Sequence, residues 1–561
     1  MDFVSPFRHT GELNAIERLK LERHPLEVQA AVRSVYAIEG AAAIARVEGE
    51  AERLKWVGLY PQRQGGNAFM LRVKIPGGRL SATQARRIGE IVERHARGPA
   101  AHPKWGDRYC DLTTRQDIQL HWVRIEDVPR IWDQLEDVGL TSVQACGDSA
   151  RNVLCCPLAG LDAEEAFDAS PVADAISAYF TGNREYANLP RKFKLSVTGC
   201  LEDCAQAEIN DVGMLPARGR DGRYGFNLFV GGGLSDGARM ASDIDVFVGL
   251  DQAVECTRAI AQVFGELGNR ENRGLSRMRY LVQELGPEGF RAALVARARC
   301  ELEPAGESLT RRYRGDHVGV HAERRAGRVS VGCSVTVGRL RGEDLIEAAR
   351  IAEAYGDGGL RLATDQNLIF TGIGEEHLDA ALGEELFSRH SPFPGPFSRG
   401  VVACTGNEFC RFAIVETKAR AQQWAERLDA EFAEHFGGPA GSVDRPETSV
   451  VRMHFSGCSA SCAQPQIADI GFRGETAHVG DMIVEAVDIA LGGSLGAEAA
   501  FGDWIVGALP VDDVPAALHA LVGRHVAERR GGERFTTWVR RRSPLELRAA
   551  LEGQRDEGQA R

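Results

Sequence analysis

The amino-acid sequence contains two copies of one pattern, in the same order and at similar spacing. The tripeptide Gly-Arg-Leu at residues 78–80 precedes a segment with helical periodicity, and the same tripeptide at residues 338–340 precedes another. Residues 114–120 recur as residues 364–370, and two further matches contain cysteines. A chain that repeats itself in this way is expected to fold as two similar units related by a pseudo-twofold axis.

Each copy is expected to combine a small strand–helix–strand unit with a larger α/β unit that carries the cysteines. This arrangement indicates a tandem-duplicated α+β fold. The predicted boundaries are a polar, helical lead-in at 1–48, first-copy units at 49–135 and 136–301, a linker at 302–318, and second-copy units at 319–390 and 391–550.

The composition narrows the class of function. The net charge of −12 argues against a nucleic-acid binder, which needs a basic field, and no apolar run reaches the roughly 18 residues of a membrane helix. The N-terminus lacks the basic start and apolar core of a secretory signal, so we expect a cytoplasmic protein. In a reducing compartment, 13 cysteines favour metal or redox chemistry over disulfides.

Four cysteines of the second copy are the strongest candidate metal ligands: Cys404, Cys410, Cys458 and Cys462. They have the spacing C-x5-C and C-x3-C, and each pair lies in a glycine-containing turn. Four thiolates from two such turns can converge on a [4Fe–4S] cluster. Zinc usually takes cysteine pairs separated by about two to four residues, which fits the first pair poorly. Buried inert thiols are the alternative for any single cysteine.

The first copy provides an internal control, because it retains three of the four ligand positions: Cys156, Cys200 and Cys204. The position that matches Cys410 holds Asp162. A second cluster with Cys155 as its fourth ligand is disfavoured, since adjacent cysteines point in diverging directions. We therefore expect a cluster in the second copy only.

The segments ACTGNEFC and SGCSASC, which contain the four cysteines, resemble the signature of the siroheme-dependent sulfite and nitrite reductases. The resemblance extends from Trp56 to about Arg542. It implies a sulfite reductase hemoprotein-like fold with ferredoxin-like half-domains, and two cofactors, siroheme and a [4Fe–4S] cluster, that share Cys462. It also implies ferredoxin as the electron donor. Ser459 replaces the proline that usually follows the third cysteine, which removes no ligand.

Four basic residues are candidates for binding an anionic substrate: Arg72, Arg151, Lys192 and Lys194. Alternation in the segment 192–197 predicts a strand with both lysines on one face. A solvated strand face is the alternative for such a pair. The resemblance places anion-binding arginines and lysines at these four positions, where cationic groups can orient the oxyanion and supply protons as its bonds break.

Four polar residues near matching places in the two copies are weaker candidates for contacts with siroheme: Arg115, Gln116, Gln366 and Asn367. Local hydrogen bonds within a central strand explain these residues about equally well. The two interpretations differ in what the side chains contact, which is either the cofactor or the protein itself.

Two features favour sulfite as the substrate. Nitrite reductases of this family usually have asparagine at the position of Lys194, and sulfite is largely dianionic near neutral pH, so an extra cation favours it. Tyr60 and Cys146 match positions where some sulfite reductases of the family have an adjacent tyrosine and cysteine. We therefore expect assimilatory six-electron reduction of sulfite to sulfide. Ferredoxin-dependent reduction of nitrite to ammonia is the alternative.

Tyr60 ends an apolar stretch that is expected to run as a buried strand, and Cys146 precedes Arg151 in the same region of the chain. If both side chains reach the cofactor pocket, a thioether with two hydrogens fewer can join them. Two unlinked, buried residues are the alternative.

One further class of function is consistent with a cluster alone. A non-catalytic iron–sulfur sensor or assembly protein would need neither a haem nor a ring of cations, so it is the remote alternative. For the enzyme we expect a monomer that takes a small oxyanion and engages neither nucleic acid nor a membrane.

Overall fold

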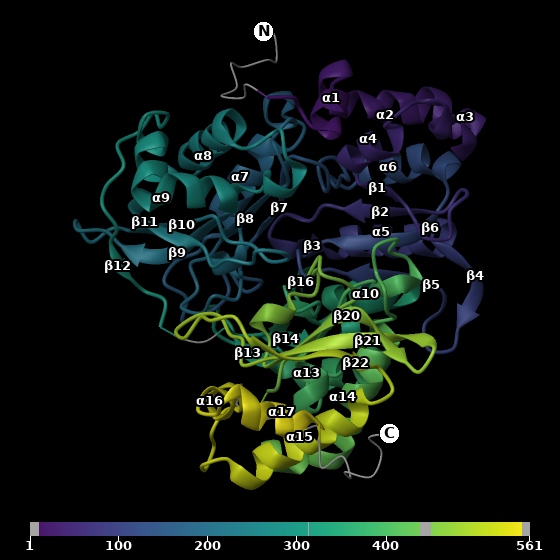
Figure 1. Ribbon diagram of the computed structural model, residues 1–561, viewed down its shortest axis with the longest axis vertical. Helices are drawn as coiled ribbons and strands as arrows, with labels where there is room; N and C mark the ends of the chain where they lie inside the picture. The colour runs from purple at the N-terminus through teal and green to yellow at the C-terminus, as the bar shows by residue number, and fades with distance from the viewer. Residues whose placement is uncertain (1–10, 312–313, 438–449, 553–561) are drawn as a thin grey trace.

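The computed structural model describes residues 11–311, 314–437 and 450–552 (Figure 1). The chain starts with short helices, α1 (Ala15–Glu22), α2 (Val28–Ala31), α3 (Ala37–Glu39) and α4 (Glu50–Arg53). Lys20 fixes α1 to the first cysteine-bearing unit, because its ammonium group donates to the carbonyl oxygen of Leu189 at 2.8 Å and lies 3.7 Å from the carboxylate of Asp148.

Two small sheets form the half-domains. The first contains, in spatial order, β1 (Leu59–Pro61), β2 (Phe69–Val73), β6 (Ile118–Val123), β5 (Gly106–Leu112) and β15 (Arg339–Arg341), with β4 (Arg97–His102) paired to β5. The second contains β13 (Gly319–Ala322), β14 (Arg328–Cys333), β17 (Leu368–Gly374), β16 (Gly359–Leu362) and β3 (Arg79–Ser81). Each sheet therefore ends in a strand from the other copy.

The exchanged strands explain the repeated Gly-Arg-Leu tripeptide. Gly78 and Gly338 enter these strands with φ of 68° and 70°, a left-handed conformation that favours glycine. A β-carbon at Gly78 would also lie 2.4 Å from the carbonyl oxygen of Leu362. The helices that follow, α5 (Ala82–His95) and α10 (Gly342–Tyr355), pack against each other, so the two copies share one hydrophobic core.

The remaining helices of the half-domains cover the outer parts of this core. They are α6 (Val128–Glu136), α11 (Leu378–Leu382) and α12 (Glu385–Arg389). Leu135, Ala381 and Leu386 are almost fully buried there.

The two cysteine-bearing domains have the same sheet topology. The first sheet contains β7 (Ala150–Leu154), β8 (Phe193–Val197), β9 (Val212–Arg218), β10 (Tyr224–Val230) and β11 (Ser242–Gly249). The second contains β18 (Val401–Ala403), β19 (Met453–Ser456), β20 (Ile470–Val479), β21 (Met482–Leu491) and β22 (Asp503–Pro510). In each sheet the first three strands are parallel and the others antiparallel.

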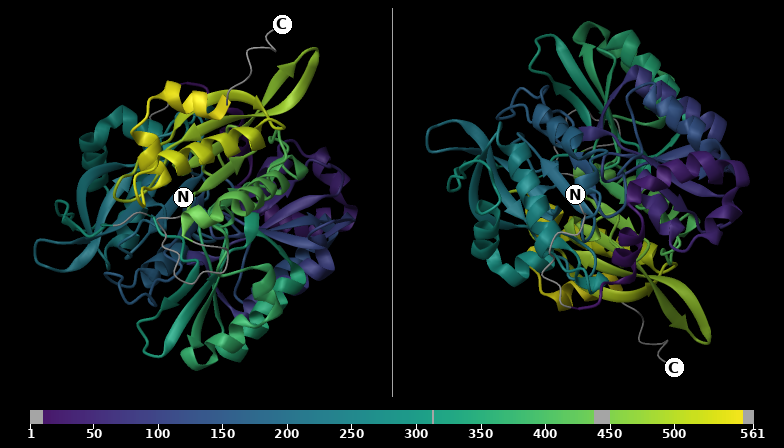
Figure 2. Two further views of the ribbon diagram at one scale, coloured as in Figure 1. Left: turned by 90° about the horizontal axis from the view of Figure 1, so that it is seen from below. Right: turned by 90° about the horizontal axis from the view of Figure 1, so that it is seen from above.

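Helices pack on these sheets and bury their apolar faces. The first sheet is accompanied by α7 (Ser170–Phe180), α8 (Ala253–Leu267) and α9 (Met278–Val295), and the second by α13 (Pro396–Arg399), α14 (Lys418–Phe432), α15 (Val514–Glu528), α16 (Phe535–Arg540) and α17 (Pro544–Glu552). Figure 2 shows the C-terminal helices, in yellow, beside the strands of the second sheet. None of the described helices combines the length and the apolar character that a membrane span requires.

The described residues of the segment expected to be a linker, 302–311 and 314–318, are built into the fold. Its strand β12 (Glu307–Ser308) pairs with β9, and Arg314 donates to the carboxylate of Asp365 at 2.9 Å. Asp316 accepts two hydrogen bonds from Arg399, both of 2.8 Å. The segment therefore connects the two copies by buried polar contacts as well as by the chain itself.

Candidate functional site

The predicted cluster cysteines lie in two turns at one edge of the second cysteine-bearing sheet. Cys404 directly follows β18, and Cys458 follows β19, which pairs in parallel with β18. Because the carboxyl ends of parallel strands meet at the same edge, the two turns face each other there. Cys410 and Cys462 lie farther along the same turns.

Backbone amides surround the thiols of these turns. The sulfur of Cys404 accepts hydrogen bonds from the amides of Gly406 (3.4 Å) and Gly457 (3.2 Å). Amides also bond to the thiols of Cys410 and Cys458. Burial and the nearby Cys462 raise the pKa of Cys404 to about 12, so a thiolate there needs the positive charge of bound iron. Hydrogen bonds to the sulfurs are also what tunes an iron–sulfur cluster, so the turns fit that group.

Cys462 is the exposed member of the four, whereas the other three are half-buried. Thr114 of the first half-domain donates to the carbonyl oxygen of Cys462 at 3.0 Å. This bond holds the second-copy cysteine turn against the first copy. An open ligand on that side of the cluster is suited to a bridge to a second metal centre.

Two of the four predicted cations, Arg72 and Lys192, lie close enough to Cys462 to interact with it, and Arg151 and Lys194 interact with Lys192. Burial, then the charges of Arg277 and Arg151, lower the pKa of Lys192 to about 7. The nearby Cys462 raises this pKa but does not outweigh them. Burial alone would lower the pKa of Arg72. The nearby groups Cys146, Asp117, Tyr60 and Cys462 outweigh burial, so the pKa is raised. We call Arg72, Arg151, Lys192 and Lys194 the cationic recess.

Lys194 is positioned by its backbone, and the ammonium groups of both lysines of the cationic recess stay available. The amide of Lys194 donates to Asp211 at 2.9 Å, and Arg277 forms an ion pair with the same carboxylate at 3.0 Å. Within the described residues, neither lysine ammonium group has a protein hydrogen-bond acceptor. Basic groups that have no acceptor within the protein fit an acidic macrocycle and a small anion, which can supply the missing acceptors.

Sequence reasoning did not identify Asp211, Arg277 or Asp117 as parts of this site. Asp117 is buried and lies 3.8 Å from Arg72, and burial raises its pKa to about 6. The recurrence of Asp211 as Asp469 in the second copy was the available signal. Arg277 gave no signal, because it comes from a distant helix boundary.

The four candidate siroheme contacts have protein partners in the structure. Arg115 donates to Asn210 and to the Leu195 carbonyl group (2.9 and 3.0 Å), and Gln116 donates to the carbonyl groups of Cys155 and Leu362. Gln366 donates to the carbonyl groups of Leu112 and Ala403, and Asn367 accepts from the Val335 amide. The glutamines thus join the two copies, which favours the structural interpretation for both of them, whereas Nδ2 of Asn367 has no hydrogen-bond partner among the described residues and its role stays a prediction.

Arg115 differs from the other three, because its guanidinium group lies next to the cationic recess. Burial lowers its pKa to about 9, and Asp117, Arg151 and Arg72 are among the charges that act on it. Its Nε has no hydrogen-bond partner among the described residues. A role for Arg115 in cofactor binding stays a prediction.

Tyr60 and Cys146 are neighbours at the edge of the recess. Burial, and then the Cys146 thiol, raise the pKa of the Tyr60 phenol well above its usual value. The covalent link between them stays a prediction. The expectation of one long strand before Tyr60 is wrong, since Leu54–Val57 form a 3-10 helix and only Leu59–Pro61 are extended.

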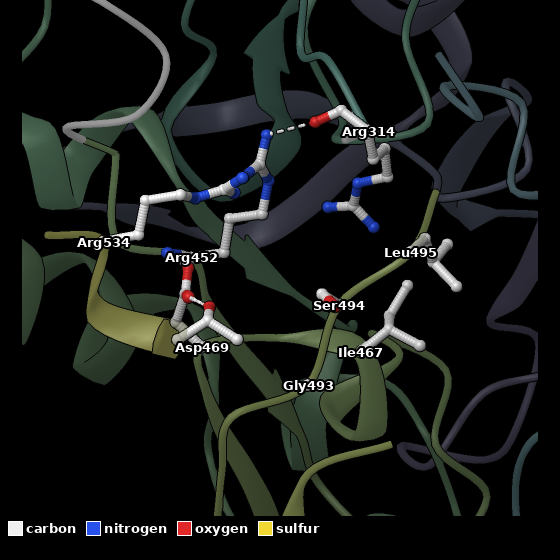
Figure 3. Close-up of a pocket in the computed structure, with 9 residues that line it drawn as sticks. Arg314, Arg452, Ile467, Asp469, Gly493, Ser494, Leu495 and Arg534 are labelled. Atoms are coloured by element: carbon white, nitrogen blue, oxygen red, sulfur yellow. Dashed lines mark hydrogen bonds between the residues drawn. The ribbon is translucent and has the colours of Figure 1, made fainter. Parts of the chain in front are cut away.

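The second copy has a basic cavity at the place that corresponds to the cationic recess (Figure 3). The amide of Arg452 donates to Asp469 at 2.8 Å, as that of Lys194 does to Asp211. Arg314 and Arg534 also line this cavity. Pseudo-symmetry therefore extends to the polar groups of the two copies.

Two half-domains that share a core, a four-cysteine turn pair and a cationic recess define a metal-dependent oxidoreductase acting on small anions. Comparisons with known proteins give the same class. The nitrite and sulphite reductase 4Fe-4S domain matches residues 146–302 and 395–557, and the nitrite/sulfite reductase ferredoxin-like half domain matches residues 60–138 and 321–385.

Individual relatives match over most of the chain. The assimilatory ferredoxin-dependent nitrite reductase of Haloferax mediterranei is 42% identical over 88% of this chain and 85% of its own length. The ferredoxin–nitrite reductase of Synechococcus elongatus is 39% identical over 91% of this chain and 96% of its own length. The structure of the Mycobacterium tuberculosis NirA protein is similar with a TM-score of 0.87, 32% identity, and coverage of 96% of this chain and 98% of that one.

The chain belongs to the siroheme-dependent nitrite and sulfite reductase family. It is an enzyme of this family, with the predicted fold, and its cofactors are a siroheme and a [4Fe–4S] cluster. The named relatives favour nitrite, which was the alternative substrate, over the expected sulfite.

The charge argument for sulfite is weakened by burial. Burial, then Lys192 and Arg115, hold the pKa of Lys194 well below its usual value. Counting lysines in the sequence therefore overstates the positive charge that the protein itself presents to the substrate.

Proposed function

We propose that this enzyme catalyses the ferredoxin-dependent, six-electron reduction of nitrite to ammonia. The observation that carries the proposal is that relatives named as ferredoxin-dependent nitrite reductases match nearly the whole chain. The overall conversion takes one nitrite, six electrons and eight protons to one ammonium ion and two water molecules. Siroheme supplies the metal at which the anion is reduced, and the [4Fe–4S] cluster supplies electrons to it.

The protein has two tasks in this reaction, binding an anion and delivering protons. We assign both to the cationic recess of Arg72, Arg151, Lys192 and Lys194. The arginines keep their charge and orient the oxyanion, since guanidinium groups match the geometry of two oxygens. Lys192, with a pKa near 7, can hold or release a proton at neutral pH, which suits a general acid.

We assign the cluster to Cys404, Cys410, Cys458 and Cys462, with Cys462 as the ligand shared with siroheme iron. Its exposure on the side of the recess supports this assignment. Tyr60 and Cys146 are proposed to line the same pocket. We further propose the division into units at 49–135, 136–301, 319–390 and 391–550, and a monomer that receives its electrons from ferredoxin.

Sulfite is the second candidate substrate, and Lys194 is the observation that favours it. When it is protonated, a lysine in place of asparagine adds one positive charge. The attraction of that charge is stronger for a dianion such as sulfite than for the monoanion nitrite. Bound substrate and an acidic macrocycle both favour the protonated lysine. Lys194 therefore sets the balance between the two anions.

Steady-state kinetics with reduced ferredoxin test the proposal. The expected result is a kcat/KM for nitrite that exceeds the value for sulfite, and the reverse order would overturn the assignment to nitrite. Lys194→Asn should lower kcat/KM for sulfite more than for nitrite. The control Lys104→Asn, at an exposed lysine paired with Glu426 at 3.0 Å, should change neither. An equal loss for both anions in Lys194→Asn would show that this lysine acts in folding or cofactor binding.

A further inference from the structure

Three cysteines of the first copy and a histidine of the segment between the copies form a compact group of metal-ligand side chains: Cys156, Cys200, Cys204 and His317. One ligand atom from each lies within 4.8 Å of the other three, and no other group of His, Cys, Asp or Glu in the described residues is as compact. All four side chains are buried, between 2% and 5% exposed. We call them the Cys3His group.

Three elements bring the Cys3His group together. Cys156 follows β7, and the turn with Cys200 and Cys204 follows β8, which is parallel to β7, so these cysteines repeat the arrangement of the cluster turns. His317 comes from the segment between the copies and takes the fourth place. Asp162, at the position that matches Cys410, is not part of the group.

The group has the dimensions of a site for a single ion. Ligands at about 2.0–2.3 Å from one tetrahedral zinc ion lie about 3.3–3.8 Å from each other. The distance from the Cys156 sulfur to Nε2 of His317 is 3.5 Å. The thiolates of an iron–sulfur cube stand on separate corners and are farther apart, which agrees with the less compact set in the second copy.

Several contacts hold the group in place before any metal binds. The amide of Glu202 donates to the Cys200 sulfur at 3.5 Å, and Thr364 donates to the Cys204 carbonyl group at 2.8 Å. His317 has φ of 55°, a conformation that costs free energy for a residue with a β-carbon. Its neighbour Asp316 is fixed by Arg399. A histidine held in this conformation at three thiols is consistent with ligation.

We propose that Cys156, Cys200, Cys204 and His317 bind one Zn²⁺ ion. Four protein ligands leave no open coordination position, so the site is structural and takes no part in the reduction. The ion fastens the segment between the copies to the first cysteine-bearing domain. The first copy thus keeps the metal-binding turns of the duplicated pattern and uses a histidine in place of the missing fourth cysteine. This proposal is independent of which anion the enzyme reduces.

Metal analysis of the purified holoenzyme is the first test. We expect one zinc per chain in addition to the cofactor iron, and a holoenzyme without zinc overturns the proposal, as does a disulfide within the group. X-ray absorption at the zinc edge should show three sulfurs at about 2.3 Å and one nitrogen at about 2.0–2.1 Å. A zinc ion with four sulfur or mainly oxygen ligands also overturns it.

Variants locate the ion. Cys204→Ser and His317→Ala should lose zinc, whereas Cys155→Ser, a change at the adjacent buried cysteine outside the group, should retain it. Cys410→Ser should lose the [4Fe–4S] signal and keep zinc. Equal zinc loss in Cys155→Ser and Cys204→Ser contradicts the ligand assignment. If the first two variants do not fold, the absorption measurement on the unaltered holoenzyme decides.

Discussion

Arg339 is the residue whose replacement should most weaken the junction between the two copies and the cluster turn. It lies on the exchanged strand β15 with a fully buried side chain, and its guanidinium group bonds both oxygens of Asp111 at 2.8 and 3.2 Å. A third bond of 2.8 Å reaches Glu408, within the turn between the first two cluster cysteines. The ring of Tyr109 lies 4.4 Å from the guanidinium carbon.

The change Arg339→Met keeps the apolar stem and removes the charge. Breaking a buried ion pair from one side costs about 3–5 kcal/mol, because the other charge is left buried. Asp111 retains His121 at 3.0 Å and Lys418 at 3.7 Å, so we expect the lower end, about 3 kcal/mol of unfolding free energy. Arg339→Lys should recover only part of it, since an ammonium group cannot bond both carboxylate oxygens in the same way.

Urea denaturation followed by tryptophan fluorescence measures this loss, and iron content measures retention of the cluster. The matched control is Arg350→Met, which removes the surface ion pairs of Arg350 with Glu347 and Glu384 and should cost less than about 1 kcal/mol. Arg339→Met should also release iron at lower urea than the unaltered protein does. A loss below about 1 kcal/mol, similar to the control, would refute the role of Arg339 as the junction.

Three other predictions concern the cluster, the pocket and pH. Cys410→Ser should abolish the iron–sulfur signal and Cys256→Ser, at a buried cysteine elsewhere, should leave it; equal loss in both would contradict the ligand assignment. Peptide mass spectrometry should find Tyr60 and Cys146 joined with two hydrogens fewer, and separate, unmodified peptides would exclude the link. Burial lowers the pKa of His525 to about 4, so as the pH falls from 6.5 to 4 the unfolded chain binds more protons than the folded one, and the free energy of unfolding decreases by up to about 3 kcal/mol. The urea midpoint should depend less steeply on pH over this range in His525→Phe than in the unaltered protein. An unchanged pH dependence would contradict the role of His525.

The repeated segments of the sequence predicted the duplicated architecture and the two turns with cluster cysteines. They did so because each repeated feature is local: a tripeptide, a cysteine pair, or an aspartate before a strand. The exchange of β3 and β15 between the half-domains could not be predicted in the same way. Strand pairing between copies depends on the arrangement of the whole chain, and a short strand has the same sequence pattern in either sheet.

The candidate site was predicted less evenly than the fold. The cationic recess and the proximity of Tyr60 and Cys146 follow from motifs, whereas Gln116 and Gln366 turned out to bond the backbone of the opposite copy. Nothing in the sequence pointed to His317. It lies between the copies, so comparing the copies with each other could not reveal it as a metal ligand. The substrate preference depended on the charge of Lys194, which burial changes and sequence does not reveal.

The stoichiometry of a reaction with purified, reduced ferredoxin and nitrite tests the central claim most directly. Ferredoxin oxidised, nitrite consumed and ammonium formed would be measured in one reaction mixture. The account predicts that ferredoxin gives up six electrons for each nitrite consumed, with one ammonium formed. The account would be contradicted if the enzyme did not consume nitrite. It would also be contradicted if nitrite were consumed without forming ammonium while sulfite was converted to sulfide under the same conditions.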